Sequence, residues 1–381
     1  MKPLIKWPGG KSSEINQFLT LIPDYDRYIE PFAGGGAVFF HLNPHKACIN
    51  DNSVKLMDFY RLVKAQDPEF HRILNLYGRT FDSLRALCEK RYRDILGLYR
   101  LYEAAMDAGI PIEELRIHQY LVIEIASDPA VLSELITDKS DFLLCLLSSV
   151  DEKFRRTVIN NRKKKFSDRD LKENLITGFL AGYYTYFRGV YNEIAAEKVL
   201  CSAQYASANF YFIREYCYGS MFRYNGKGEF NIPYGGTSYN RKDFAGKVEN
   251  MFRDDVARLM QRTELYNEDF ETFLAKVQPG ERDFIFLDPP YDTEFSDYEG
   301  HAFGHKDHER LADCLKQTKA QFLLVIKNTD FIFGLYEGSF RMLAFDNKYM
   351  YNVRSRNERK SEHLIITNIP EGTVPWLREN I

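Results

Sequence analysis

Apolar and polar residues follow two different patterns along this chain, and the changes between them divide it into three stretches. In the first stretch and the last, short apolar runs alternate with segments of helical periodicity. Up to residue 63 the pattern predicts strands at 28–30 and 46–50. From residue 243 it predicts helices at 243–262 and 305–318 and strands at 264–267, 284–287, 321–326 and 361–368. Strands that alternate with helices are typical of an α/β fold with a mainly parallel sheet.

Residues 64–242 have a different pattern, with many charges at helical periodicity, for example at 81–87 and 115–125. Further on, Asn225-Gly226-Lys227-Gly228 lies between aromatic-rich segments and predicts a β-hairpin turn that would project Lys227 and Tyr234 toward a groove. We therefore expect a discontinuous α/β domain of residues 1–63 and 243–381. A mostly helical domain with a hairpin, residues 64–242, would be inserted into it.

The most informative motif is Asp288-Pro289-Pro290-Tyr291, where two prolines stop the apolar strand 284–287. Ligands bind at the carboxyl ends of strands in open α/β sheets, so a carboxylate, prolyl carbonyls and an aromatic face are expected at the site. An exocyclic amino group needs such acceptors, and its ring needs a stacking surface. The motif therefore favours methyl transfer to an amine, although a plain strand-ending turn is also compatible with it.

A second motif is the glycine turn 34–36, which follows the strand 28–30 and precedes a predicted helix. Glycines there allow a cofactor to approach the backbone closely, or two elements to pack closely. A dinucleotide-binding G-x-G-x-x-G pattern would need a third glycine where Phe39 stands, so NAD is disfavoured. Asp51, at the end of strand 46–50, could accept hydrogen bonds from ribose hydroxyls or cap the next helix.

The third motif, Lys6-Trp7-Pro8-Gly9-Gly10-Lys11, ends like a phosphate-binding loop but lacks the required spacing. The P-loop pattern would need glycine where Ile5 stands, and too few residues precede it to form the strand. A methyl-donor pocket fits better, with Trp7 along the cofactor and the Lys11 cation facing its carboxylate. An N-terminal turn before a helix is the alternative.

With these three motifs in this order, the chain resembles the Dam-type, D12 class DNA adenine-N6 methyltransferases. That resemblance implies a Rossmann-like S-adenosylmethionine-dependent sheet and an inserted target-recognition domain with a hairpin. It also implies a flipped adenine in duplex DNA as substrate. The segments 183–188, 222–225 and 228–235 are weaker family features, whereas the helical stretch 66–175 is an insertion relative to compact members.

Site residues follow from the resemblance position by position. The catalytic set is Asp288, Pro289, Pro290 and Tyr291. The cofactor would contact Trp7, Lys11, Glu30, Phe32, Gly34, Gly36, Asp51, Asp269, Phe270 and Asp288, although Asp269 and Phe270 would also suit the start of a helix. DNA contacts are expected from Arg223, Asn225, Lys227, Asn231, Tyr239 and Arg241.

Composition limits the remaining choices. A net charge of −3 over 381 residues does not suit a non-specific nucleic-acid coat, so DNA contacts should be local. Candidate basic patches are 155–165, 241–242 and 354–360. Six scattered cysteines without C-x-x-C spacing predict neither a metal site nor a disulfide framework. The chain shows no apolar signal core or membrane span, so we expect a cytoplasmic protein, or a nuclear one if the host has a nucleus, with a cognate restriction endonuclease as a possible partner.

Several other functions stay open at this point. A cytosine-N4 methyltransferase can use the same Asp-Pro-Pro-Tyr corner, and an RNA substrate is also conceivable. A catalytically silent DNA-binding protein would not need the complete set of motif residues. An NAD-linked oxidoreductase is the remotest possibility.

Overall fold

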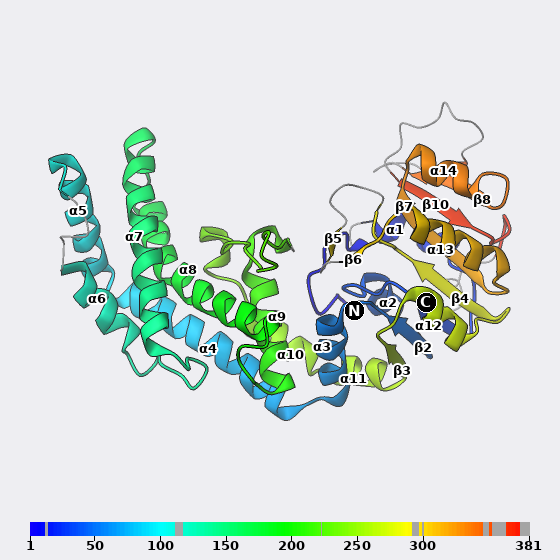
Figure 1. Ribbon diagram of the computed structural model, residues 1–381, viewed down its shortest axis with the longest axis horizontal. Helices are drawn as coiled ribbons and strands as arrows, with labels where there is room; N and C mark the ends of the chain where they lie inside the picture. Colours follow the sequence, from blue (N-terminus) through cyan, green and yellow to red (C-terminus); the bar gives the residue numbers. More distant parts are fainter. Residues whose placement is uncertain are drawn as a thin grey trace. The chain divides into compact units, whose positions relative to one another are not determined.

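A computed structural model describes residues 1–11, 14–110, 117–221, 223–291, 297–298, 301–345, 350–352 and 363–373. The chain forms two compact units (Figure 1). Unit 1 comprises Met1–Gln66 and Met251–Ile381, and unit 2 comprises Asp67–Asn250. The boundaries expected from the sequence lie at 63 and 243, three and eight residues earlier respectively.

Unit 1 is built on an eight-stranded sheet with the order β3-β2-β1-β4-β7-β10-β8-β9. The first five strands of that order are parallel, and β10, β8 and β9 are antiparallel. The strands are β1 (Arg27–Glu30), β2 (Ala47–Asn50), β3 (Thr263–Tyr266), β4 (Asp283–Leu287), β7 (Gln321–Lys327), β8 (Arg341–Phe345), β9 (Met350–Asn352) and β10 (His363–Thr367). A separate pair consists of β5 (Asp297–Tyr298) and β6 (His301–Ala302). The predicted α/β class and all six predicted strands are confirmed.

Both faces of this sheet are buried, which explains the uninterrupted apolar run in β4. Ile285 and Leu287 belong to a cluster with residues of α12 and α13, whereas Phe286 faces the other way and stacks on Phe18 with ring centroids 5.4 Å apart. Parallel strands covered on both faces are continuously apolar for this reason. The helices of unit 1 are α1 (Ile15–Phe18), η2 (Leu19–Leu21), α2 (Ala37–Leu42), α3 (Val54–Ala65), α11 (Asp254–Gln261), α12 (Phe270–Val277), α13 (His305–Gln317) and α14 (Asp330–Tyr336).

The prediction of one helix at 243–262 is wrong in one respect, because this stretch forms two helices. α10 (Phe244–Met251) ends before α11 begins, and Arg253 between them has an extended backbone. The carbonyl oxygen of Met251 accepts a hydrogen bond from the Gln66 side chain at 3.3 Å instead of continuing a helix. Asp254 and Asp255 then occupy the first turn of α11, where the helix dipole favours acidic residues.

Unit 2 is mostly helical. Its helices are α4 (Pro68–Lys90), α5 (Tyr92–Ala108), α6 (Ile117–Ala126), α7 (Lys139–Lys163), α8 (Asp168–Ala195), α9 (Ala203–Tyr216), η4 (Tyr218–Ser220), η5 (Thr237–Tyr239) and nearly all of α10. Side chains cap the starts of four of them, as when Asp67 accepts the Phe70 N–H at 2.8 Å. Within the part of the chain that the structure describes, no helix is both long enough and apolar enough to cross a membrane.

The predicted hairpin around 225–228 is a tight turn without regular strands. Tyr224 and Phe230 form an isolated antiparallel bridge, as do Cys217 and Tyr234. The Asn225 side-chain oxygen accepts the N–H groups of Lys227 at 2.9 Å and Glu229 at 3.0 Å, so a side chain organises the turn. The expectation for Tyr234 is wrong: its ring is buried, and its hydroxyl lies 3.1 Å from the Asn240 side-chain oxygen.

Candidate active site

The three sequence motifs meet at the carboxyl edge of the parallel strands. β1 ends at Glu30, β2 is followed by Asp51, and β4 is followed by Asp288. β1 pairs with β2 on one side and with β4 on the other, so the connections leave the β1–β4 boundary in opposite directions. Such a switch point opens a crevice at the strand ends, which is where α/β proteins bind ligands.

The Asp-Pro-Pro-Tyr corner is held by a lysine from the N-terminal segment. Lys11 is buried, and its Nζ lies 3.0 Å from Asp288 Oδ1 and 3.2 Å from the Gly9 carbonyl oxygen. The same ammonium donates to the Tyr291 hydroxyl and lies 4.9 Å from the centre of the Tyr291 ring. A motif at the start of the chain thus contacts one about 280 positions later.

The glycine turn is shaped around Trp7. Gly34 has φ +48°, and a Cβ there would lie 2.7 Å from Trp7 Cδ1. The Gly34 N–H donates to Asp51 Oδ2 at 2.9 Å, and the Gly34 carbonyl accepts the Tyr60 hydroxyl at 2.9 Å. The turn is therefore fixed from both sides, and Gly36, at φ +65°, precedes α2.

Asp51 orders the loop after β2 rather than capping the next helix. Its Oδ1 accepts the Ser53 N–H at 2.9 Å, while the Ser53 hydroxyl is the cap of α3. The other oxygen holds the glycine turn, as described above.

Asn50 and Asn267 connect this edge to β3, and sequence reasoning missed both roles. The Asn50 amide donates to the carbonyls of Pro31 at 3.0 Å and Glu268 at 2.9 Å, and its oxygen accepts the Glu268 N–H at 2.9 Å. Asn267 donates to the Asp51 carbonyl at 2.7 Å. A buried asparagine at the end of an apolar strand was the available signal, since such a side chain must find partners.

Asp269 and Phe270 stand at the start of α12, in a mainly structural arrangement. Asp269 caps α12 through the Glu271 N–H at 3.0 Å and pairs with Arg310 at 2.6 Å. The Phe270 ring is buried 5.5 Å from the Phe32 ring, and the Arg310 guanidinium lies 4.8 Å from its centre. The helix-cap role weighed for Asp269 is therefore present, with Phe32 and Phe270 as an aromatic pair beside it.

Acidic groups dominate the electrostatics of this edge. Burial raises the pKa of Asp288 to about 6, although the Lys11 cation opposes the shift. Burial also raises the pKa of Tyr291 to about 12 and that of Glu30 well above its ordinary value, the latter reinforced by Asp288 and Asp51. Among the residues that the structure describes, Glu30 Oε2 is buried without a hydrogen-bond partner. A cationic or hydrogen-donating ligand would satisfy that oxygen.

The expected DNA-contact residues lie in unit 2 and differ in how exposed their side chains are and in the contacts they make within that unit. Arg223 and Lys227 are exposed, and Asn225 and Asn231 are half-buried in the turn region. The Tyr239 hydroxyl accepts the Gly219 N–H at 3.2 Å, and Lys242 lies 3.9 Å from the Tyr239 ring centre. These contacts fix Tyr239 against its own unit.

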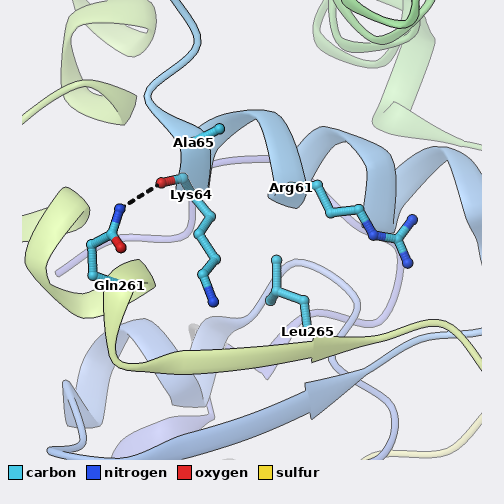
Figure 2. A pocket seen from close by; sticks show the side chains of 5 residues that line it. All are labelled: Arg61, Lys64, Ala65, Gln261 and Leu265. Atoms are coloured by element: carbon cyan, nitrogen blue, oxygen red, sulfur yellow. Dashed lines mark hydrogen bonds between the residues drawn. The ribbon is translucent and has the colours of Figure 1, made fainter.

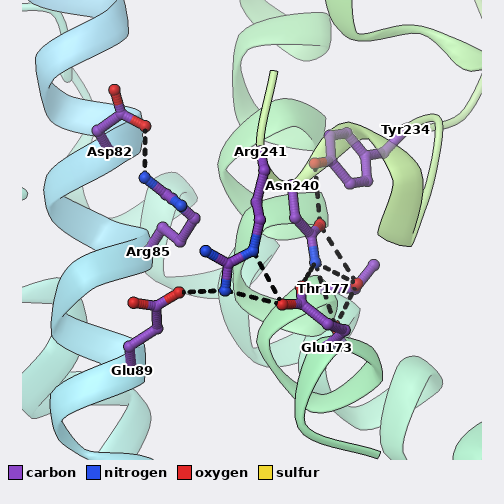
Figure 3. A network of polar contacts seen from close by, with 8 residues as sticks. All are labelled: Asp82, Arg85, Glu89, Glu173, Thr177, Tyr234, Asn240 and Arg241. Carbon is purple, nitrogen blue, oxygen red and sulfur yellow. Dashed lines mark hydrogen bonds and ion pairs between the residues drawn. The ribbon is translucent and has the colours of Figure 1, made fainter. Parts of the chain in front are cut away.

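Arg241 is engaged by two carboxylates. Figure 3 shows its guanidinium between Glu89 of α4 and Glu173 of α8. Its Nη2 lies 2.8 Å from Glu89 Oε1 and 2.9 Å from Glu173 Oε1. Beside it the buried Asn240 donates to Thr177 at 3.1 Å and to Glu173 at 3.0 Å. Asn240 and Arg241 therefore attach the segment after η5 to α4 and α8. The two carboxylates also neutralise much of the Arg241 charge.

Other basic candidates are also paired. Arg155 contacts Asp151 at 3.1 Å, Arg156 contacts Glu152 at 3.4 Å and Arg162 contacts Asp107 at 2.6 Å, which leaves exposed lysines at 163–165. The patch at 354–360 lies outside the described residues. No cluster of metal-ligating side chains occurs in the described ranges.

A cavity of about 400 Å³ lies elsewhere in unit 1 (Figure 2). Arg61, Lys64 and Ala65 of α3 line it with Gln261 and Leu265. Lys64 donates to the Thr263 carbonyl at 2.6 Å, and Arg61 pairs with Asp58 at 2.6 Å. None of the expected site residues lines this cavity.

Comparisons with known proteins agree with the geometry at the strand ends. A family model of D12 class N6 adenine-specific DNA methyltransferases matches residues 7–95 and 125–351. The type II methyltransferase M.CviBI of Paramecium bursaria Chlorella virus NC1A is 26% identical, over 97% of this chain and 100% of the relative. M.MjaIII of Methanocaldococcus jannaschii is 25% identical, over 97% and 99% respectively.

A DNA adenine methylase of Vibrio cholerae is 21% identical over 86% of this chain and 82% of its own length. The family match includes the N-terminal lysine motif from Trp7, the glycine turn and the Asp-Pro-Pro-Tyr corner, the three segments that meet at one edge of the sheet. The chain therefore belongs to the D12 class N6 adenine-specific DNA methyltransferase family.

Proposed function

We propose that unit 1 transfers a methyl group from S-adenosylmethionine to N6 of an adenine flipped out of duplex DNA, and that unit 2 recognises the target. The observation that carries this proposal is the placement of Asp288 at a switch point of the sheet, held by Lys11 beside the glycine turn. A cognate restriction endonuclease is a further proposal, supported by the type II names of two relatives.

The residues around the strand ends suit this cofactor. Its sulfonium group supplies an electrophilic methyl, and its amino acid part carries an ammonium. The unsatisfied oxygen of Glu30 fits a cationic donor, and an acidic side chain directly after β2, here Asp51, suits ribose hydroxyls. We propose that Trp7, Phe32, Phe270, Gly34 and Gly36 form the walls, because glycine alone allows backbone so close to Trp7.

The Asp-Pro-Pro-Tyr corner would act on the amine. The lone pair of adenine N6 is delocalised into the ring, so N6 is a weak nucleophile. The Asp288 carboxylate and the Pro289 carbonyl would accept its two N–H groups and direct the lone pair at the methyl, a contribution from positioning and electrostatics. As the N–C bond forms and the S–C bond breaks, N6 becomes cationic, and one proton leaves through Asp288 to water. Tyr291 would stack on the flipped base.

The test is modification-sensitive sequencing of DNA from a methylation-free bacterial host that expresses the full chain. We expect N6-methyladenine at one short motif with wild type, and a loss of at least about 100-fold with Asp288→Ala. Asp313→Ala is the matched control, because Asp313 is an exposed carboxylate on α13 and should leave the mark unchanged.

Binding of S-adenosylmethionine to Asp288→Ala completes the test, and we expect it to stay close to wild type. N4-methylcytosine in place of N6-methyladenine would refute the proposed substrate. Undiminished marking by Asp288→Ala would refute the proposed role of this carboxylate.

A further inference from the structure

Lys11 uses every hydrogen of its ammonium group inside the protein. A lysine ammonium has three N–H donors and no acceptor. Here its acceptors are Asp288 Oδ1 at 3.0 Å, the Gly9 carbonyl at 3.2 Å and the Tyr291 hydroxyl. The side chain is only 3% exposed, so these contacts replace hydration. A contact with the cofactor carboxylate would have to break one of them.

Asp288, in contrast, has one oxygen available. Lys11 contacts Oδ1, and within the described part of the chain Oδ2 accepts no hydrogen bond. A carboxylate held through one oxygen presents the other in a defined direction. Tyr291 is held likewise by its hydroxyl, which leaves the ring to define the orientation of a stacked base.

We propose that Lys11 is a positioning residue that orients Asp288 and Tyr291 for the amine, and that it does not bind the cofactor carboxylate. This inference rests on the proposed function of the same site and assigns a role different from the one that the sequence favoured. Removing Lys11 should impair the transfer step while cofactor binding stays nearly intact.

The charge of Lys11 has a second consequence, for pH dependence. Among the residues that the structure describes, the ionisable groups that act on Asp288 are Lys11, Glu14, Tyr291 and Glu30, and of these Lys11 is the cation. Burial and Glu14 raise the pKa of Asp288, and Lys11 lowers it, with the balance at about 6. Only the ionised Asp288 carboxylate can accept hydrogen bonds from the Lys11 ammonium and from the amine N–H at the same time. Activity should therefore fall as the pH drops through the pKa of Asp288. Without Lys11 the pKa must rise, so the acid limb should move to higher pH.

The experiment compares wild type with Lys11→Met, Lys11→Arg and the exposed control Lys2→Met, using a duplex oligonucleotide that carries the mapped site. Single-turnover rates at saturating cofactor are measured from pH 5 to 9. We expect Lys11→Met to lose at least about 100-fold at neutral pH, with its acid limb raised by about one pH unit or more. Lys11→Arg, which keeps the cation, should have an acid limb close to that of wild type.

Dissociation constants of S-adenosylmethionine and of its decarboxylated analogue separate the two roles. If Lys11 positions Asp288, Lys11→Met keeps both the affinity and the ratio of the two constants within about three-fold of wild type. A ten-fold loss of affinity confined to the carboxylated cofactor, with an unchanged saturating rate, would overturn the inference. An unmoved acid limb would overturn it as well.

Two further controls keep the outcome clear. Thermal melting shows whether Lys11→Met is folded, and Lys11→Gln, which also removes the cation, carries the same binding comparison if it is not. Failure of both wild type and Lys2→Met to methylate DNA would instead count against the proposed function. The two dissociation constants would still show whether Lys11 contacts the cofactor carboxylate.

Discussion

Single residues at the strand ends show how a site is built from positions far apart in sequence. Gly34 illustrates this at one atom, because its missing Cβ makes room for Trp7 and its backbone has a positive φ. Its N–H and carbonyl are bound by Asp51 and Tyr60. Conformation and packing therefore both require glycine at this position, while the two hydrogen bonds hold its backbone in place.

We predict that Gly34→Ala weakens S-adenosylmethionine binding by at least ten-fold and destabilises the protein by about 1–3 kcal/mol. The added methyl would displace the Trp7 ring, and alanine is strained at φ +48°. Calorimetric binding and thermal melting measure both effects. Gly334→Ala on α14 is the control, because a Cβ there would meet no heavy atom within 4 Å beyond its chain neighbours and its own helix backbone; it should leave the affinity unchanged and the stability equal or up to about 1 kcal/mol higher. Unchanged affinity in Gly34→Ala would contradict the cofactor wall proposed here.

At the scale of elements, the helical unit relies on close contact between α7 and α8. A Cβ on Gly182 would lie 2.7 Å from the Leu146 Cα, and one on Gly178 would lie 3.2 Å from the Val150 Cα. The backbone of α7 cannot move aside to make room for a methyl group, as the end of a flexible side chain could. These glycines, one helical turn apart, let the two long helices approach each other.

Gly182→Ala should therefore destabilise the protein by about 2 kcal/mol, despite alanine's higher helix propensity. Gly189→Ala lies seven residues further along α8, where no heavy atom is within 4 Å, and it should be neutral or stabilising by up to about 1 kcal/mol. Chemical denaturation of the full chain measures both. Equal effects of the two substitutions would argue against a close helix contact at Gly182.

At the scale of the whole molecule, the long insertion leaves unit 1 and returns to it at neighbouring points. Gln66, the last residue before unit 2, donates to Met251 at 3.3 Å, the first residue after it. An α/β fold tolerates an insertion whose two ends lie close together, because its own core is unaffected. Because the net charge of the chain is −3, the DNA binding that we propose for unit 2 would depend on local cations.

We predict that Lys227→Ala reduces the salt dependence of DNA binding by about one ion, whereas Arg241→Ala changes it by much less. Lys227 is exposed at the turn, but Arg241 is already neutralised by Glu89 and Glu173. Dissociation constants measured over a series of salt concentrations give both slopes. A slope change for Arg241→Ala as large as that for Lys227→Ala would show that the ion pairs of Arg241 with Glu89 and Glu173 break when DNA binds.

The sequence alone determined the α/β class, the strands and the family, because burial on both sheet faces and a glycine turn leave patterns that are local in sequence. Tertiary structure decided what those local patterns do not contain. It paired Arg241 with two carboxylates, buried Tyr234, split the helix after Met251, and filled the three donors of Lys11. Each of these outcomes depends on a partner distant in the chain, and ion pairs and hydrogen bonds form according to proximity in the fold, which spacing along the chain does not report.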